Sequence, residues 1–190
     1  MQIFCLVGAS GSGKDTLCNE IVKRQLAKPI VTYTTRPIRP NEVNGREYNF
    51  VTDEQYCNFK RQNKIIEERS YNTKHGVWRY FVADDGQIDE SSKEKYVIVD
   101  SLEGATSLVK KYGYQVCVIH IYLDDETRLM RCIKREKEGR KDYIELCRRF
   151  FHDAEDFSKD KFKKLLYWMV IENYDLKKAM DDLTQVIEGF

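Results

Sequence analysis

The chain has few of the residues that interrupt regular structure or cross-link a fold. Only three of its 190 residues are proline, and all three lie between positions 29 and 40, so most of the sequence is free to form helices and strands. Its six cysteines contain no CxxC pair, and its three histidines have no metal-ligand spacing. These absences argue against a disulfide framework or a zinc site and indicate a reducing, cytoplasmic compartment.

Charge of one sign and long apolar runs are also missing. The 32 basic and 31 acidic residues leave a net charge of +1, so no overall field draws the protein to nucleic acid. No apolar run approaches the roughly 18 residues that a membrane-spanning helix needs. The N-terminal residues lack the charged region and cleavage site of a signal peptide. We expect small-molecule ligands, no nucleic-acid or membrane partner, and a monomer or homodimer.

Short apolar runs alternate with amphipathic segments along the chain. The sequence predicts strands at 3–7, 29–34, 96–100, 116–123 and 166–171. It predicts helices at 14–26, 105–113, 126–137, 142–158 and 176–187. This alternation indicates an α/β fold with a parallel sheet covered by helices on both faces. The stretch 36–90 reads as an irregular excursion with a pair of strands at 65–71 and 77–82.

A glycine-rich loop follows the first predicted strand and begins the first predicted helix. It comprises Gly8, Ala9, Ser10, Gly11, Ser12, Gly13, Lys14, Asp15 and Thr16. Glycines let such a loop turn tightly and aim its N–H groups inward, where the helix N-terminus adds partial positive charge. Lys14 has the spacing that reaches the β- and γ-phosphates of ATP. The loop therefore predicts an ATP-dependent phosphotransferase.

Magnesium would accompany ATP in such a site. Asp15 stands where a Ser or Thr usually binds the ion, so either Asp15, directly or through water, or Thr16 would take that role. Asp100 ends an apolar strand and is the natural second acid near the metal.

A second anion site is indicated by two arginines three residues apart, flanked by hydroxyl groups. The run begins Thr32-Tyr-Thr-Thr-Arg36-Pro-Ile-Arg39 and continues with Glu42, Gly45, Tyr48 and Phe50 at fixed spacing. Two guanidinium groups can hold a phosphate dianion with paired hydrogen bonds. This run closely resembles the acceptor-binding segment of guanylate kinases.

The resemblance implies a P-loop kinase fold in a single domain with three layers. Its core would comprise residues 1–31, 96–127 and 159–190, with a small β-rich acceptor-binding insertion at about 32–90. A helical lid would occupy about 128–150. Residues 128–149 contain nine basic and four acidic residues, a local excess that suits a flap closing over polyphosphate.

The resemblance also implies roles for individual residues. Arg36, Arg39 and Tyr48 would hold the phosphate of GMP, Thr32 would join them, and Glu42 would support the arginines. Glu67 would read guanine, because one carboxylate can accept hydrogen bonds from both N1–H and the 2-amino group. Asp100 would also line the acceptor site.

The lid and the ATP side carry further expected residues. Arg131, Arg135, Arg148 and Arg149 resemble the lid arginines of these kinases. Lys14, Arg39, Arg135 and Arg149 would spread charge on the transferring group, with Arg131 on ATP. Asn173 would lie beside the adenine.

The sequence departs from the family pattern in the base-binding segment. Residues 76–81 lack the second glycine and the base-reading hydroxyl of these kinases, unless Tyr80 substitutes, and the 99–104 turn lacks one aspartate. The predicted reaction is ATP-dependent phosphorylation of a nucleoside monophosphate, GMP or dGMP. The alternatives are another nucleotide, ribose 1,5-bisphosphate, or a non-catalytic guanylate-kinase-like module that binds a protein partner.

Overall fold

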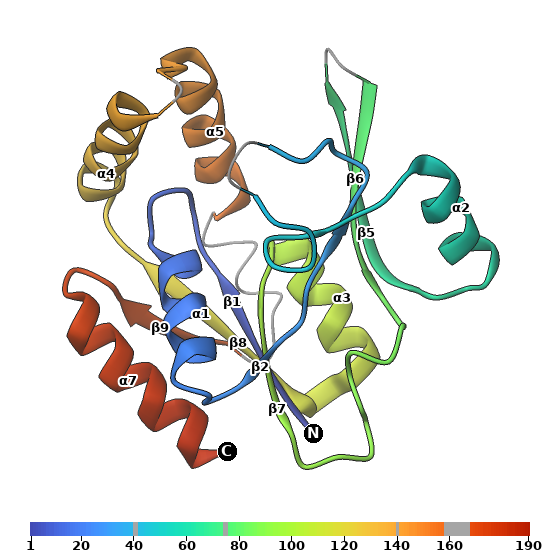
Figure 1. Cartoon of the computed structure of the whole chain (residues 1–190). Helices are drawn as coiled ribbons and strands as arrows, with labels where there is room; N and C mark the ends of the chain where they lie inside the picture. The colour runs from blue at the N-terminus through green and yellow to red at the C-terminus, as the bar shows by residue number, and fades with distance from the viewer. Residues whose placement is uncertain (40–41, 74–75, 140, 158–167) are drawn as a thin grey trace.

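A computed structural model describes residues 1–39, 42–73, 76–139, 141–157 and 168–190 (Figure 1). Its central sheet has five parallel strands in the spatial order β2-β7-β1-β8-β9. These strands are β1 (Gln2–Val7), β2 (Lys28–Pro29), β7 (Lys95–Val99), β8 (Val116–Tyr122) and β9 (Trp168–Glu172). The parallel α/β architecture predicted from the sequence is confirmed.

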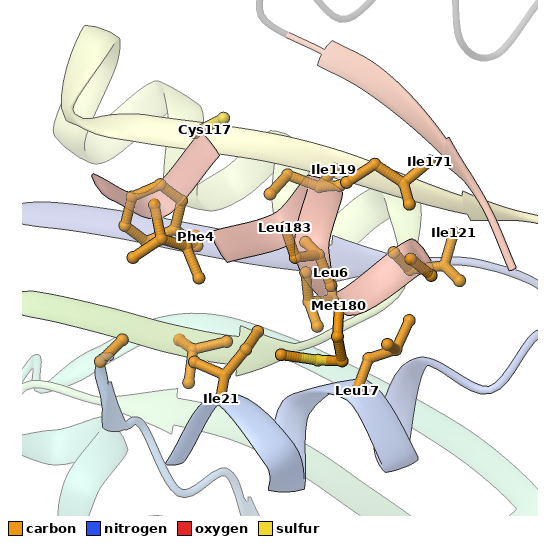
Figure 2. Packing of buried hydrophobic residues seen from close by; sticks show 14 residues of the cluster. Phe4, Leu6, Leu17, Ile21, Cys117, Ile119, Ile121, Ile171, Met180 and Leu183 are labelled. Carbon is orange, nitrogen blue, oxygen red and sulfur yellow. The ribbon is translucent and has the colours of Figure 1, made fainter. Parts of the chain in front are cut away.

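Helices cover both faces of this sheet because the buried strands are apolar on both sides. On one face, α1 (Lys14–Lys23) and α7 (Leu176–Gly189) contribute Leu17, Ile21 and Leu183 to a buried cluster that also contains Phe4 of β1 (Figure 2). On the other face, α3 (Leu102–Tyr112) packs against the opposite sides of β1, β7 and β8. A 3₁₀ turn, η1 (Gly113–Gln115), joins α3 to β8.

The predicted strand at 29–34 was wrong as a single element. The structure divides it between β2, which pairs with β7, and β3 (Tyr33–Thr34), which belongs to a second sheet. Pro29 lies in β2, at an edge of the central sheet, where its missing N–H breaks no ladder. The chain thus leaves the core at the point where the acceptor segment begins.

The second sheet is mixed and has the order β4-β3-β6-β5. It contains β4 (Asn49–Phe50) and the hairpin of β5 (Ile65–Thr73) and β6 (Gly76–Ala83). The predicted strand pair is therefore confirmed. The description of 36–90 as irregular was incomplete, because it missed helix α2 (Asp53–Arg61). A capping box formed by Thr52 and Gln55 starts that helix and was readable in the sequence.

Two helices, α4 (Asp125–Glu138) and α5 (Tyr143–Asp156), lie near the glycine-rich loop (Figure 1). Both match the predicted helices to within two residues. Arg140, residue 158, the expected start of the last strand at 166–167 and the segment 159–165 of the predicted core lie outside the described residues. Within the described ranges, no helix is both long and apolar enough to cross a membrane.

Candidate active site

The glycine-rich loop joins β1 to α1 and adopts a conformation that depends on glycine. Gly11 and Gly13 have φ angles of 83° and 87°, in the left-handed region that side chains disfavour. A Cβ atom on Gly13 would collide with the side chain of Asn173. Gly13 caps α1 without a side-chain hydrogen bond, so the first N–H groups of the helix remain available for an anion.

Asn173 contacts this loop, and Arg131 contacts Asn173. The Asn173 amide is buried and donates from Nδ2 to the carbonyl oxygen of Ser12 at 2.7 Å. Arg131, on α4, donates from Nη2 to the Asn173 carbonyl at 2.9 Å. The turn after β9 and the helix α4 are thereby fixed to the ATP side of the candidate site.

Arg128 connects the loop to both lid helices and was missed by the sequence analysis. Its buried guanidinium donates to the Ser10 carbonyl at 3.0 Å and lies 4.5 Å from the centre of the Phe150 ring. Asp153 of α5 accepts from the Ser10 N–H at 2.8 Å and lies 3.6 Å from Arg128. Arg128 was visible only as one of many basic residues in an amphipathic helix, so no local signal singled it out.

Lys14, Asp15 and Thr16 begin α1 in consecutive order. The Lys14 ammonium lies 3.9 Å from the Asp15 carboxylate, and 75% of the Asp15 side chain is exposed. Thr16 is exposed as well. Neither oxygen-bearing side chain is buried in the protein interior, so both can approach a ligand arriving from solvent.

Arg36 is buried in the acceptor segment and is held by Glu42. Its Nη1 and Nη2 donate to the two Glu42 carboxylate oxygens at 3.0 and 2.9 Å. The guanidinium also faces the rings of Tyr48 and Phe50, each with its centre 5.4 Å away. This geometry matches the expectation that Glu42 supports the arginine.

Arg39 and Thr32, the other residues expected to hold the acceptor phosphate, belong to the same segment. Arg39 is exposed, and its backbone N–H donates to Glu42 at 2.8 Å. Its charge reaches α5, since it is one of the cations that lower the pKa of Glu145 after the hydrogen bond from Arg148. Thr32 is buried, and its carbonyl accepts from the Asn49 N–H at 2.9 Å.

Three tyrosines, Tyr48, Tyr71 and Tyr80, pack together on the acceptor side and are called the tyrosine wall below. The Tyr48 and Tyr80 rings meet edge to face with centres 5.6 Å apart, and Tyr71 meets Tyr80 at 5.7 Å. Burial, together with the neighbouring Tyr80 and Asp15, raises the pKa of Tyr48 to about 12. Burial opposes a raised pKa for Arg36, but hydrogen bonds to Glu42 and Tyr80 raise it. Tyr80 therefore lies close enough to Arg36 to influence its pKa.

Glu67 and Asp100 form a buried acidic pair that Arg69 bridges. Arg69 Nη2 lies 3.2 Å from Glu67 Oε1 and 2.6 Å from Asp100 Oδ1. Asp100 also accepts from the Ser101 N–H at 2.7 Å. Gly104 permits this packing, because a Cβ atom there would overlap the Asp100 carboxylate.

The electrostatics of this pair follow from burial and like charge. Burial first, and Asp100 second, raise the pKa of Glu67 to about 7, whereas Arg69 lowers it. Burial also raises the pKa of Asp100, again opposed by Arg69. Arg69 was not singled out in the sequence; its only signal was alternation with Glu67 on one face of a strand.

The arginines that the sequence analysis assigned to a lid lie on α4 and α5, and two of them, Arg148 and Arg149, contact acidic partners. Arg149 donates to Glu136 at 3.1 Å, and Arg148 donates twice to Glu145 at 2.7 Å. Arg135 is exposed on α4, with Nη2 3.8 Å from the Cys132 sulfur. The structure thus brings Arg131 to the phosphate loop and leaves Arg135 and Arg149 at the α4–α5 pair.

Buried polar atoms without a hydrogen-bond partner gather in these regions. Among the described residues they are Gln2 Nε2, Ser12 Oγ, Arg36 Nε, Arg69 Nε, Asp100 Oδ2 and Asn173 Oδ1. Apart from that of Gln2, all belong to residues of the glycine-rich loop, its Asn173 neighbour, or the acceptor side. Since buried polar groups are normally satisfied, their concentration here indicates a polar ligand.

The oxygen atoms of Asp15 and Thr16 are suitable ligands for the magnesium ion that accompanies ATP. Mg²⁺ binds through one or two protein oxygens plus substrate phosphates and waters. The exposed Asp15 and Thr16 oxygens beside Lys14 suit this mode. No group of three or more His, Cys, Asp or Glu side chains within the described ranges could hold a metal alone. Asp100 lies instead with Glu67 and Arg69.

A parallel α/β sheet with a glycine-rich P-loop sequence after β1, a mixed second sheet with arginines beside it, and two helices that contact the loop define the fold class of the P-loop phosphotransferases. A family model described as guanylate kinase matches residues 1–189. The chain therefore belongs to the guanylate kinase family, whose members are nucleoside monophosphate kinases.

Individual relatives agree with this assignment. The chain is 35% identical to a guanylate kinase of Thermotoga maritima over 121 residues, which is 62% of this chain and just over half, 56%, of that protein. It is 26% identical to one of Wolbachia pipientis, covering 97% of this chain and 88% of the relative. The crystal structure of guanylate kinase from Anaplasma phagocytophilum shares the fold, with a TM-score of 0.72 at 22% identity, covering 99% of this chain and 85% of that one.

Proposed function

We propose that this chain transfers the γ-phosphoryl group of ATP to GMP or dGMP. The observation that carries the proposal is the joining of a phosphate loop to an acceptor site through one residue, Tyr48. Tyr48 faces Arg36 and is close enough to Asp15 and Arg69 for both charges to act on its pKa. The acceptor phosphate would thus lie between Arg36 and the start of α1, within reach of ATP.

Transfer between two bound nucleotides requires alignment and neutralisation of charge, with no covalent enzyme intermediate. Lys14 and the loop N–H groups would hold the ATP phosphates, with Arg131 and Asn173 on the same side. Arg36 Nε and the Tyr48 hydroxyl would hold the acceptor phosphate, with Thr32 and Arg39. When bound at Asp15 and Thr16, Mg²⁺ would supply additional positive charge to the phosphates.

Lid closure would bring further cations to the reacting groups. Arg135 and Arg149 are available on α4 and α5, where their present partners are a cysteine sulfur and Glu136. Exchanging the Glu136 carboxylate for a phosphate would keep the Arg149 guanidinium paired, and Arg135 would exchange a weak sulfur contact for a charged acceptor. Closure would also exclude water, which protects the γ-phosphoryl from hydrolysis.

Hydrogen exchange of α4 and α5 should slow only when both nucleotides are bound. The basic excess of this segment repels itself without ligand and relaxes around the phosphates. We expect at least about a tenfold slowing with a bisubstrate analogue, and little change in the C-terminal half of α7, whose Leu183 and Ile187 are buried in the core. Equal protection of α4 and α5 in the free protein would show that no lid closes.

Acceptor specificity is tested with a panel of substrates in an ATP-coupled assay. The panel contains GMP, dGMP, AMP, CMP, UMP and ribose 1,5-bisphosphate. We expect GMP or dGMP to have the highest kcat/KM, with AMP lower by several hundredfold, because adenine lacks the N–H pair that Glu67 accepts. Faster turnover of any other acceptor would refute the base assignment, and no turnover at all would favour a non-catalytic module.

Glu67→Gln should remove most of the preference for GMP over AMP. Glutamine keeps the shape but accepts through one oxygen only and carries no charge, so one or two charge-assisted hydrogen bonds are lost, each worth about 1.5–3 kcal/mol. The ratio of kcat/KM for the two nucleotides measures the effect. The matched control is Glu68→Gln on the same strand, whose carboxylate contacts Tyr56 and Lys60 instead.

GMP use should also depend on pH through Glu67. Guanine needs the ionised carboxylate, and the pKa of Glu67 is raised to about 7. Below that pH the fraction ionised, and with it kcat/KM for GMP, should fall about tenfold per pH unit. The Glu67→Gln variant has no such titration, so the difference between the two pH profiles isolates this residue from the phosphate of the substrate.

The setting of the reaction is part of the proposal. All six cysteines are free thiols in the structure, which supports the expectation of a reducing cytoplasm. The ligands would be nucleotides alone, with the protein acting as a monomer or homodimer.

A further inference from the structure

Arg69 is a largely buried cation on the acceptor side, and the proposed phosphate transfer does not use it. It extends from β5 with 15% of its side chain exposed and touches both carboxylates of the base-binding region. The hairpin pairs Arg69 with Tyr80 across the strands, so Arg69 lies next to the tyrosine wall rather than on the outer surface of the molecule.

An ion triad that served only packing would satisfy its own donors and acceptors. Here Arg69 uses Nη2 for both carboxylates, while its buried Nε–H and the buried Asp100 Oδ2 have no partner. A buried guanidinium donor that lacks an acceptor costs stability. The arrangement is therefore incomplete in the free protein and would be completed by a ligand that offers an acceptor next to a donor.

The base-binding segment also lacks the hydroxyl expected at 76–81. The matching position is Phe81, which is buried in the core of the second sheet. The nearby cation of β6, Arg79, is paired with Asp53 at 2.5 Å and lies over the Tyr56 ring. Arg79 is thus directed to α2 and away from Glu67. Arg69, which contacts both carboxylates of the acidic pair, can supply the missing donor.

We propose that Arg69 is a specificity-determining residue that donates from its guanidinium to the carbonyl oxygen at C6 of the acceptor base, while Glu67 accepts from N1–H. The inference rests on the proposed phosphorylation of a guanine nucleotide and deepens it. Arg69 and Glu67 together form a donor–acceptor pair that is complementary to the lactam edge of a 6-oxopurine.

The chemistry of the bases then sets the order of acceptors. Guanine and hypoxanthine both present N1–H beside a C6 carbonyl, so IMP should be used within about tenfold of GMP, since it lacks only the 2-amino hydrogen bond. Adenine presents an unprotonated N1 beside an amino group, the reverse pattern. The Arg69 donor would face the 6-amino group, which is also a donor, and the Glu67 carboxylate would face the N1 lone pair, which is also an acceptor. The kcat/KM for AMP should therefore be several hundredfold lower.

Arg69 also favours guanine indirectly, by keeping Glu67 ionised. Its charge opposes the rise in the pKa of Glu67 that burial and Asp100 cause. Without it, more of the Glu67 population would be protonated at neutral pH and unable to accept from N1–H. The acidic limb of the pH profile for GMP should therefore move to higher pH when Arg69 is replaced.

The test compares wild type, Arg69→Met, Arg69→Lys and the control Arg61→Met with GMP, IMP and AMP. Methionine keeps an unbranched chain without donors, and Arg61 is an exposed arginine at the end of α2 whose hydrogen-bond partner is Asn58. In Arg69→Met we expect the GMP to AMP ratio of kcat/KM to fall at least about tenfold. The change should lie in the acceptor KM, with the KM for ATP unchanged. Arg69→Lys should restore part of the ratio, and Arg61→Met should match wild type.

A purely structural role predicts a different pattern. It would lower kcat/KM for all three nucleotides equally, with unchanged ratios and pH profile, and this would overturn the proposal. If Arg69→Met does not fold, the wild-type protein with IMP still tests the proposal. A kcat/KM for IMP as low as that for AMP would overturn the proposed recognition of N1–H and the C6 carbonyl. Failure of wild type to use any purine nucleotide would refute the proposed function itself, which separates the two failures.

Discussion

Lys14→Ala should lower kcat by at least about 100-fold while the protein remains folded. Removing one preorganised charge from a transferring phosphoryl group costs this much or more. Lys14 stands at the first position of α1, with its ammonium near Asp15 and 20% of its side chain exposed. It fills no core position, so its loss should leave the melting temperature nearly unchanged.

Steady-state kinetics with saturating ATP and GMP measure the effect, and circular dichroism confirms the fold. The control is Lys23→Ala in the last turn of the same helix, which removes an exposed lysine paired with Glu20 and should keep full activity. Near-normal turnover in a folded Lys14→Ala protein would exclude the kinase mechanism.

Arg36→Ala should raise the KM for GMP by about 100-fold or more and leave the KM for ATP almost unchanged. A guanidinium–phosphate contact is charge-assisted and desolvated here, and two hydrogen bonds of about 1.5–3 kcal/mol each would account for this loss. Arg36 is buried, and its Nε has no protein partner. It is therefore built to meet an anion on that side.

Arg36→Lys should recover only part of the affinity, because an ammonium cannot hold Glu42 and a phosphate in the fixed directions of a guanidinium. Arg46→Ala in the following turn is the matched control, since Arg46 is exposed and pairs with Glu47. A thermal melt measures the stability lost with the Arg36–Glu42 ion pair, so that this effect is separated from the loss of affinity for GMP. An unchanged KM for GMP with a raised KM for ATP would mean that this site binds the other nucleotide.

Local sequence patterns were sufficient where a short segment determines its own structure. The glycine-rich loop between β1 and α1 was predicted residue by residue, because the left-handed Gly11 and Gly13 and the free helix N-terminus are local features. The alternation of strands and helices was predicted for a similar reason. Helix α2 was missed although the sequence contains its capping box. Residues 29–34 were predicted as one strand, although their two ends pair in different sheets.

The acceptor side shows the limit of such reasoning. Glu67 and Asp100 were both assigned to the acceptor site, yet nothing in either segment indicated that an arginine would join their carboxylates. The position of Arg69 between them is set by the pairing of β5 with β6 and by the packing of α3 against β5. Arg128 is comparable, since its importance comes from contacts with Ser10 and Asp153 in distant parts of the chain.

The sequence by itself determined the fold class, the phosphate loop and the family, because each depends on residues that are close together in the chain. Only the tertiary structure decided how the base-binding region is charged, because burial and the approach of β5 to the end of β7 set the pKa of Glu67 and give it Arg69 as a partner. The same folding placed Tyr80 beside Tyr48 and Arg36. Long-range packing therefore determines which groups meet the acceptor, whereas local chemistry determines that a phosphate is bound.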